Sequence, residues 1–487
     1  MLNPGRMTTG VPGLDEILHG GLLETYSCLV RGGPGTGKTT LGMHFLTAGR
    51  GGDGVLVSLG ETEGQLRRNA QLRGLALDGV PVLDVSPSIN LSGADETFNL
   101  LETWEVEAGS IHDSILEYVR KHRPQRVFID ALSELRHMSP DAFQFRKQVL
   151  SLLRQLTALG ATVVCTAEAG SASDDDLQFL SDGVVELAQV PSGRMCAVSK
   201  LRGSDFAGGW HYYDLGANGM AVYPRLLPGH HQRSFEPESL GSGVPELDAL
   251  TGGGIERGTV TLLSGPTGVG KTTLGAHYMK EAAGRGERSV IYSFDEHRHT
   301  FVRRSTQVGL PIREMLESGH LMFEAVEPLA YDPDRFALKV RHEVETLGTR
   351  VVMLDSLSGY QQSMRGEDLQ ERVHALCRYL VNMGVTVLLI NEVNTIASPE
   401  LQVSQHGISY LADAIVLLRY MELAGELRKT VGMLKKRTGD FEKTLRELAI
   451  TDHGVQVGRP LSGLRGILSG IPEILEEKRA HDVARSR

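Results

Sequence analysis

Two short stretches of the sequence have the residue types and spacing of a phosphate-binding loop. Residues 32–39 and 265–272 both fit the pattern G-x-x-x-x-G-K-[ST], and each follows an apolar run and precedes a helical pattern. Glycines at these positions let successive backbone N–H groups turn toward phosphate oxygens, and the start of a helix adds partial positive charge. One glycine-rich turn can match by chance. Two matches in the same register predict two nucleotide sites.

The residues of these loops have predicted roles that follow from their chemistry. Lys38 and Lys271 are expected to reach the β and γ phosphates, while threonine hydroxyl groups are typical Mg²⁺ ligands. The predicted ATP-binding residues are Gly33, Gly35, Thr36, Gly37, Lys38, Thr39 and Thr40 in the first loop and Gly268, Val269, Gly270, Lys271, Thr272 and Thr273 in the second. The expected cofactors are therefore ATP and Mg²⁺.

An aspartate ends an apolar run downstream of each loop. Asp130 follows Val-Phe-Ile, and Asp355 follows Val-Met-Leu. Taken alone, such an aspartate often caps a turn or a helix. Because each follows a phosphate loop, we interpret both as Walker B acids, which complete predicted magnesium sites with Thr39 and Thr272.

Hydrolysis or phosphoryl transfer also needs a group that orients or deprotonates the nucleophile. The candidates follow the second strand of each copy, Glu61 in the first and the adjacent pair Asp295 and Glu296 in the second. Carboxylates after strands are common, so position alone does not decide. The predicted catalytic residues are Glu61, Asp295 and Glu296, together with Lys38 and Lys271 on the phosphates.

These motifs recur in the same order and at nearly constant spacing, so the chain contains two homologous copies. The period is too long for a solenoid and predicts two complete domains, each with its own core. We expect a first domain at 1–225, a linker at 226–238, a second domain at 239–460 and a tail at 461–487. The linker is expected because residues 224–238 contain three prolines and no hydrophobic periodicity.

Within each copy, β-rich runs alternate with amphipathic helical stretches. The strand-like runs are 26–31, 55–59, 126–129 and 161–166 in the first copy and 260–264, 289–294, 350–354 and 385–390 in the second. This alternation predicts an α/β fold, with a mostly parallel sheet flanked by helices in each tandem domain. Ligands are expected at the carboxyl ends of the strands.

Composition narrows the class of protein further. The 487 residues are 41% hydrophobic and 23% charged, which is typical of a globular chain, and their net charge of −10 disfavours nucleic acid as a partner. The four cysteines show no C-x-x-C pair, and no apolar run approaches the roughly 18 residues of a membrane span. We expect a cytoplasmic protein with no membrane partner.

The sequence resembles the KaiC family of circadian clock ATPases and autokinases, which are RecA-like P-loop proteins, from Met7 to about Gly470. The resemblance rests on both phosphate loops, Ile129-Asp130 and the stretches 9–21, 179–182, 200–203, 413–418 and 435–437. It implies a hexamer of two tiers that binds ATP between subunits, with an ATPase tier followed by an autokinase tier. It also implies trans-acting fingers at Lys200, Arg202, Lys435 and Arg437. Their other interpretation is a solvated basic strand end.

The family is phosphorylated on an adjacent Ser-Thr pair before an aspartate of the second domain. Here that stretch carries Ser409 and Tyr410, so the resemblance implies Ser409 as phosphoacceptor and leaves Tyr410 as a second acceptor or a packing residue. The equivalent first-copy position, Gln178-Phe179, has no hydroxyl group. Residues 466–472 resemble the start of the family's partner-docking tail, which implies signalling protein partners.

Departures from the family pattern keep other functions open. The usual glutamate pair is Gly60-Glu61 in the first copy and Asp295-Glu296 in the second, which predicts weaker or altered turnover. A signalling ATPase and autokinase is the first hypothesis. The alternatives are a RecA-like nucleic-acid motor or recombinase and a nucleotide-gated scaffold with little turnover.

Overall fold

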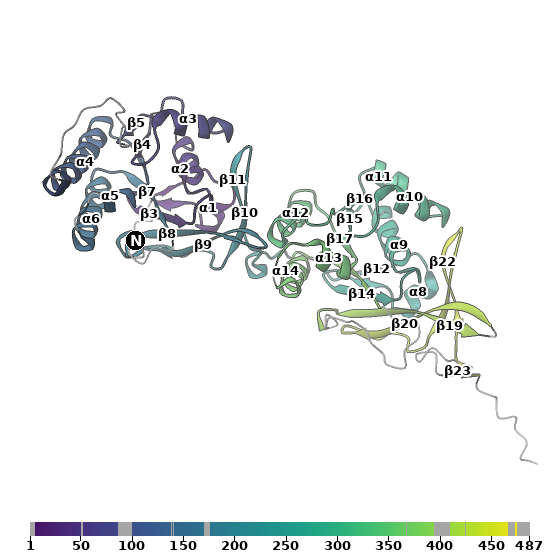
Figure 1. The fold of residues 1–487 in the computed structure, drawn as a ribbon. Helices are drawn as coiled ribbons and strands as arrows, with labels where there is room; N and C mark the ends of the chain where they lie inside the picture. The colour runs from purple at the N-terminus through teal and green to yellow at the C-terminus, as the bar shows by residue number, and fades with distance from the viewer. Residues whose placement is uncertain are drawn as a thin grey trace, which may run out of the picture. The chain divides into compact units, whose positions relative to one another are not determined.

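The computed structural model describes residues 5–49, 52–85, 100–137, 139, 141–169, 176–366, 368–393, 410–423, 425–465 and 473–474. The chain forms two compact units, Met1–Arg225 and Leu226–Arg487 (Figure 1). Within the described residues, no helix combines the length and apolar character needed to cross a bilayer. All four cysteines are free and buried.

The first unit is built on a nine-stranded sheet in the order β11-β10-β9-β8-β3-β7-β6-β4-β5. Strands β8 to β5 in this order are parallel, and β9, β10 and β11 extend the sheet in antiparallel fashion. The strands are β3 (Ser27–Gly32), β4 (Gly54–Ser58), β5 (Val82–Asp84), β6 (Arg126–Asp130), β7 (Thr162–Glu168), β8 (Gly183–Val190), β9 (Gly193–Leu201), β10 (His211–Gly216) and β11 (Gly219–Tyr223).

Helices cover both faces of this sheet. One face is covered by α1 (Leu14–Ile17), α2 (Lys38–Thr47) and α3 (Glu63–Leu72), and the other by α4 (Leu100–His122), α5 (Glu134–His137), α6 (Ala142–Ala158) and α7 (Leu177–Leu180). A buried hydrophobic cluster lies on each face. The short strands β1 (Arg6–Met7) and β2 (Leu22–Leu23) pair separately.

The second unit repeats this architecture with a nine-stranded sheet in the order β16-β15-β17-β18-β14-β19-β20-β21-β22. Its strands are β14 (Val260–Gly265), β15 (Ser289–Ser293), β16 (Leu321–Ala325), β17 (Val351–Asp355), β18 (Thr386–Glu392), β19 (Ala414–Leu423), β20 (Glu426–Lys436), β21 (Arg446–Thr451) and β22 (Gly454–Pro460). One face carries α8 (Pro245–Leu250), α9 (Lys271–Gly284), α10 (Arg298–Gln307) and α11 (Ile312–Glu317), and the other α12 (Pro333–Glu345), α13 (Leu357–Ser363) and α14 (Leu369–Asn382). Short β12 (Ser239–Leu240) pairs with β13 (Ile255–Glu256).

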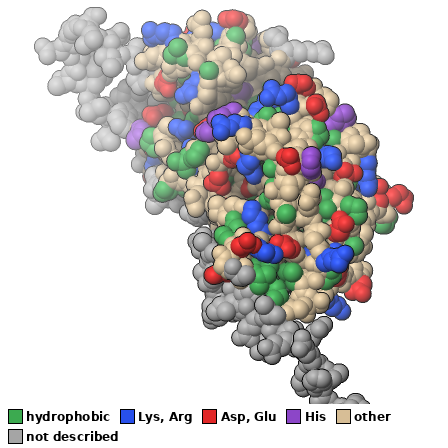
Figure 2. All heavy atoms as spheres, turned by 90° about the vertical axis from the view of Figure 1, so that its right-hand side faces the viewer, with side chains coloured by type: hydrophobic (Ala, Val, Ile, Leu, Met, Phe, Trp, Pro, Cys, Tyr) green, Lys and Arg blue, Asp and Glu red, His purple; other side chains and the backbone are tan. Residues whose placement is uncertain are grey.

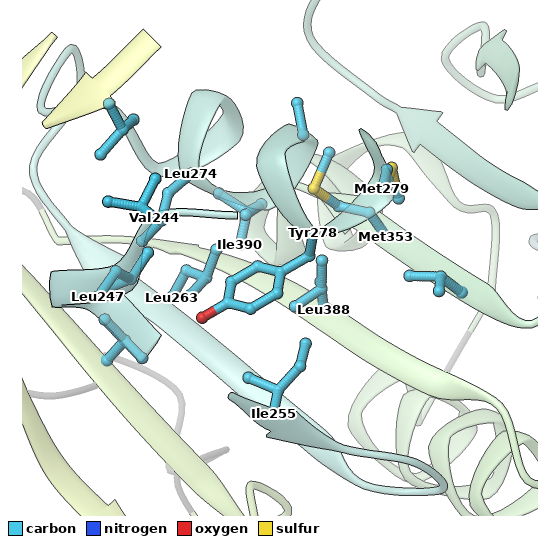
Figure 3. Close-up of a cluster of buried hydrophobic side chains, with 14 of the residues drawn as sticks. Val244, Leu247, Ile255, Leu263, Leu274, Tyr278, Met279, Met353, Leu388 and Ile390 are labelled. Carbon is cyan, nitrogen blue, oxygen red and sulfur yellow. The ribbon is translucent and has the colours of Figure 1, made fainter. Parts of the chain in front are cut away.

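Alternation along the central strands explains how two cores form on one sheet. In β17, Met353 packs into the cluster under α9, while its neighbours Val352 and Leu354 pack into the cluster on the opposite face. Successive strand side chains point to opposite faces, so continuous apolar runs are buried on both. Figure 3 shows the cluster under α9, where Tyr278 lies among side chains of β14 and β18 such as Leu263 and Leu388. This packing fixes α9 against the strand that leads into the second phosphate loop.

The predicted α/β fold class is confirmed. All eight predicted strands exist, with bounds that differ by one or two residues, as in 26–31 against Ser27–Gly32. The antiparallel extensions are not among the predicted strand-like runs, because their exposed faces carry polar residues in place of continuous apolar runs, as at β9 and β20.

The segment expected as a linker, 226–238, packs on the second unit. Leu226 is buried in its core, Phe235 lies against Gly384, and the backbone N–H of Arg233 donates to the Asn382 carbonyl at 3.0 Å. In the expected tail, β23 (Leu464–Arg465) pairs with β24 (Glu473–Ile474), and residues 466–472 and 475–487 lie outside the described residues.

Candidate nucleotide-binding sites

The first phosphate loop joins β3 to α2 at the carboxyl end of the parallel strands. Gly35 and Gly37 have φ angles of 72° and 91°, a left-handed conformation that glycine adopts without steric cost. The Lys38 ammonium group donates to the carbonyl oxygens of Gly32 at 2.8 Å and Gly33 at 3.0 Å. Burial lowers the pKa of Lys38, and the nearby carboxylates of the site oppose that shift.

The second loop, between β14 and α9, has the same geometry. Gly268 and Gly270 have φ angles of 77° and 114°, and the Lys271 ammonium group donates to Gly265 and Pro266 carbonyls, both at 2.9 Å. The remaining predicted loop residues, Thr36, Thr40, Val269 and Thr273, lie on the same loops or the first turn of the following helices. Burial also lowers the pKa of Lys271.

Both helices that follow the loops begin without a capping side chain. Gly37 and Gly270 occupy the N-cap positions and offer no side-chain acceptor, whereas α6 and α12 are capped by the carboxylates of Asp141 and Asp332. Uncapped helical N–H groups beside a buried lysine suit a phosphate group. The donor set of the loops therefore fits a nucleotide.

Each threonine predicted to bind magnesium is hydrogen-bonded to the predicted Walker B acid. The Thr39 hydroxyl group donates to Asp130 at 2.7 Å, and the Thr272 hydroxyl group donates to Asp355 at 2.8 Å. In the first site, Thr166 also donates to Asp130. Burial raises the pKa of Asp355 to about 6, opposed by the Thr272 hydrogen bond and the charges of nearby cations. A hydroxyl oxygen and a carboxylate together are the hard oxygen donors that Mg²⁺ prefers.

A cavity of about 560 Å³ opens around the second loop. The cavity is lined by the loop, by the two carboxylates that are candidates for the catalytic base and by residues of neighbouring elements. The lining residues are Thr267, Gly268, Gly270, Lys271, Thr272, Thr273, Ser293, Asp295, Glu296, Arg304, Val308, Asp355, Glu392, Lys429 and Ile450. Cations at the phosphate loop and apolar side chains at Val308 and Ile450 match a nucleotide, which has a charged end and an apolar end.

The base candidates of the two domains have different partners. Glu61 is exposed and accepts a hydrogen bond from the Asn69 amide at 3.1 Å. Glu296 forms an ion pair with Arg304, whose guanidinium nitrogen lies 2.8 Å from the carboxylate. Asp295 accepts a hydrogen bond from Ser356 at 3.0 Å.

Sequence reasoning missed a glutamate at the end of the next strand in both domains. Glu392 ends β18 and lies 3.9 Å from the Lys271 ammonium group, and Glu168 ends β7 near Lys38. Arg304 and Asn69 were also missed. Aligning the two copies residue by residue would have found all four, because each pair occupies equivalent positions of the repeat.

The predicted trans fingers lie at the opposite end of the sheet from their own phosphate loops. Lys200 pairs with Val184 at the start of β8, which runs parallel to β3, and the first loop follows the far end of β3. Lys435 pairs with Ile415 at the start of β19, with the same relation to β14. The length of the central strand therefore separates each of these two lysines from the phosphate loop of its own domain.

The finger side chains are held against their own strand ends. The Lys200 ammonium group donates to the Ser181 carbonyl at 2.6 Å, and that of Lys435 to the Ala412 carbonyl at 2.7 Å. Arg202 pairs with Asp182 at 3.3 Å and Arg437 with Asp413 at 3.0 Å. The two domains thus share one arrangement at this edge.

Ser409, the predicted phosphoacceptor, lies outside the described residues. Tyr410 is exposed, its ring packs edge-on against His374, and its carbonyl oxygen accepts a hydrogen bond from Arg437 at 3.0 Å. Tyr410 therefore adjoins the predicted finger Arg437 of the same chain, near the start of β19 and away from the end of β14 that leads into the phosphate loop.

The fold and these sites define a tandem RecA-like P-loop protein. A family profile described as "ATPase: KaiC" matches residues 7–226 and again residues 240–462. The chain belongs to the KaiC ATPase family.

Relatives match over nearly the whole chain. The circadian clock oscillator protein KaiC of Prochlorococcus marinus is 28% identical over 98% of this chain and 97% of its own length. The circadian clock protein KaiC3 of Synechocystis sp. is 28% identical over 96% and 94%. The KaiC of Synechococcus elongatus is 27% identical over 96% and 92%.

Proposed function

We propose that this ATPase works as a hexameric ring that binds Mg·ATP between protomers, hydrolyses ATP in the first tier and phosphorylates itself in the second. The main support for this proposal is the position of the predicted fingers. Lys200 and Lys435 lie at the opposite end of the parallel strands from the phosphate loop of their own domain. A head-to-tail ring would place the finger edge of one protomer against the loop edge of the next. The match to the KaiC ATPase family supports the ATPase part of this proposal.

The proposed chemistry uses the residues of each site in defined roles. Loop amides and lysine hold the β and γ phosphates, and threonine with the Walker B aspartate would hold Mg²⁺, which neutralises phosphate charge. In the first tier, Glu61 orients a water molecule. In the second, Glu296, assisted by Asp295, accepts the proton of the Ser409 hydroxyl group as its oxygen bonds to the γ phosphorus and ADP leaves. Tyr410 is the second proposed acceptor.

One observation favours a second candidate, a nucleotide-gated scaffold with little turnover. The ion pair between Glu296 and Arg304 occupies the carboxylate that should act as base. An ion-paired carboxylate is a poorer proton acceptor, so binding without rapid chemistry is the consistent alternative. Under either function, we propose a cytoplasmic protein whose tail, 461–487, docks signalling partners.

Incubation with γ-labelled ATP and Mg²⁺ tests the proposal. We expect label on the wild-type chain, loss of at least about tenfold in Ser409→Ala because that variant lacks the acceptor hydroxyl group, and retention in the nearby control Ser404→Ala. Tyr410→Phe reports on the second acceptor. Absence of label from wild type, with nucleotide bound, would favour the scaffold.

A further inference from the structure

A second cavity, of about 1170 Å³, lies on the same unit but outside the nucleotide site. It is formed by α10 and α11 beside β16, the edge strand of the sheet (Figure 1). None of the residues that line it also lines the cavity around the second phosphate loop. We call this cavity the α10–α11 groove.

The rim of the α10–α11 groove is mostly basic, and Glu317 is the acidic residue among those that line it. Arg298, Arg303 and Arg313 line it and are exposed, and across the described part of the chain none of the three forms an ion pair or side-chain hydrogen bond. His297 and His299 stand at the start of α10. Figure 2 shows the side of the molecule that carries α10 and α11, with basic side chains in blue and histidines in purple. Unpaired guanidinium groups around a concave surface attract an anionic ligand.

The floor of the groove is apolar. Val302, Leu316 and Ala325 line it and are only partly buried while packing on the hydrophobic core. No phenylalanine, tyrosine or tryptophan is among the lining residues, so the groove lacks the aromatic platforms on which nucleic-acid bases stack. An apolar floor with a basic rim instead matches a peptide that combines acidic and apolar side chains.

The first domain keeps only one of these three arginines. In the register that aligns Glu61 with Glu296, Arg298 is replaced by Glu63 and Arg313 by Asp78, whereas Arg303 is kept as Arg68. Glu63 forms an ion pair with Arg67 at 2.7 Å on its own helix. The fold therefore forms without the charges of Arg298 and Arg313, and the cluster of three arginines is particular to the second domain.

We propose that the α10–α11 groove binds an acidic peptide segment of a partner protein. Carboxylates of the peptide pair with Arg298, Arg303 and Arg313, and an apolar side chain covers Val302 and Leu316. This interaction does not depend on ATP turnover, and it places a partner next to the helix that carries Arg304, the ion-pair partner of Glu296.

The test uses the full chain and a fluorescent peptide of alternating glutamate and leucine. We expect saturable binding that weakens with ionic strength and falls at least about tenfold in the triple variant Arg298→Glu, Arg303→Glu, Arg313→Glu, since three ion pairs are lost together. The matched control, Arg365→Glu, Lys443→Glu, Arg459→Glu, makes the same charge change at exposed positions outside the groove and should retain binding. Retained binding of fluorescent ATP verifies that both variants are folded.

Three outcomes would overturn the proposal. Equal loss in both triple variants would indicate attraction to net charge alone. Equal binding of a peptide of glutamine and leucine would indicate an apolar contact without charge selection. Tighter binding of a single-stranded oligonucleotide, lost in the groove variant, would assign the groove to nucleic acid.

Discussion

At the residue scale, the two domains differ most clearly in what holds the candidate base. Asn69 offers Glu61 a neutral hydrogen bond at 3.1 Å, whereas Arg304 pairs with Glu296 at 2.8 Å and also lies 3.5 Å from the Thr273 hydroxyl group. Because the pair is partly exposed, it contributes about 1 kcal/mol. A restraint of this size slows a reaction that needs the free carboxylate by about fivefold.

Exchanging Asn69 and Arg304 between the domains should therefore move the restraint on the candidate base from the second domain to the first. With the first domain silenced by Glu61→Gln, Arg304→Asn should raise the second-domain rate of phosphate labelling or release about fivefold. With the second domain silenced by Glu296→Gln, Asn69→Arg should lower first-domain phosphate release by a similar factor. A fall in the Arg304→Asn rate would show instead that Arg304 serves the nucleotide directly, because it also lines that cavity.

At the element scale, a buried histidine fixes the helix after each phosphate loop to the last hairpin of its sheet. His44 of α2 accepts a hydrogen bond from the Met220 N–H at 2.8 Å, and His277 of α9 accepts one from the Val455 N–H at 3.0 Å. Burial lowers the pKa of His277 from 6.5 to about 4, with Lys280 acting in the same direction. The imidazole of His277 is therefore neutral in the folded state above pH about 4.

This pKa predicts a loss of stability in acid. Below pH 6.5, His277 binds a proton in the unfolded chain but stays neutral in the folded protein. The free energy of unfolding should therefore fall by about 3 kcal/mol as the pH is lowered from 6.5 to about 4. In His277→Gln, whose amide oxygen can accept the same hydrogen bond, hydrogen exchange of α9 should lose this pH dependence. Exposed His453→Gln is the control.

The loss of folding stability at low pH is partly opposed by a second group. Asp355, with its pKa raised to about 6, binds a proton more readily in the folded state and so adds stability as the pH falls from about 6 toward 3.8. It is present in both variants and cancels from their difference. An unchanged pH profile in His277→Gln would contradict the assignment to His277.

The close packing of His277 also requires a glycine at position 454, where β22 begins after the hairpin turn. Gly454 has a φ of 99°, and an added Cβ would lie 2.8 Å from Cε1 of His277. Gly454→Ala should therefore destabilise the second domain by about 2 kcal/mol more than Gly425→Ala. Gly425 has a φ of 80°, but apart from its chain neighbours no heavy atom of the described residues lies within 4 Å of an added Cβ. Equal losses in chemical denaturation would leave backbone strain alone as the cause.

At the scale of the whole molecule, contiguous sequence patterns predicted the fold. They did not predict contacts between residues that are far apart in the sequence. Four parallel strands of each domain were predicted because burial on both faces makes them continuous apolar runs, as in β17 and β18. The parallel strands β5, β8, β16 and β19 were not among the predicted runs. The phosphate loops were predictable because they are contiguous. Glu392 was not predicted from local signals, because its proximity to Lys271 depends on the pairing of β14 with β18. Arg304 lies eight residues after Glu296 on the following helix, and only a comparison of the two copies would have located it.

The proposed ring can be tested by mixing two variants, because its nucleotide sites would form between protomers. Lys271→Ala removes the loop lysine and Lys435→Ala removes the finger, so each protein alone should label weakly. If the finger serves the neighbouring loop, a Lys435→Ala protomer with its intact loop is completed by a Lys271→Ala neighbour with its intact finger. Equal amounts assembled together and then given labelled ATP should reach about a quarter of the wild-type signal, because one interface in four is productive in a random ring. A mixture no better than the mean of its components would mean that each protomer completes its own site. That result would require Lys435 to act from the end of β20, across the sheet from Lys271.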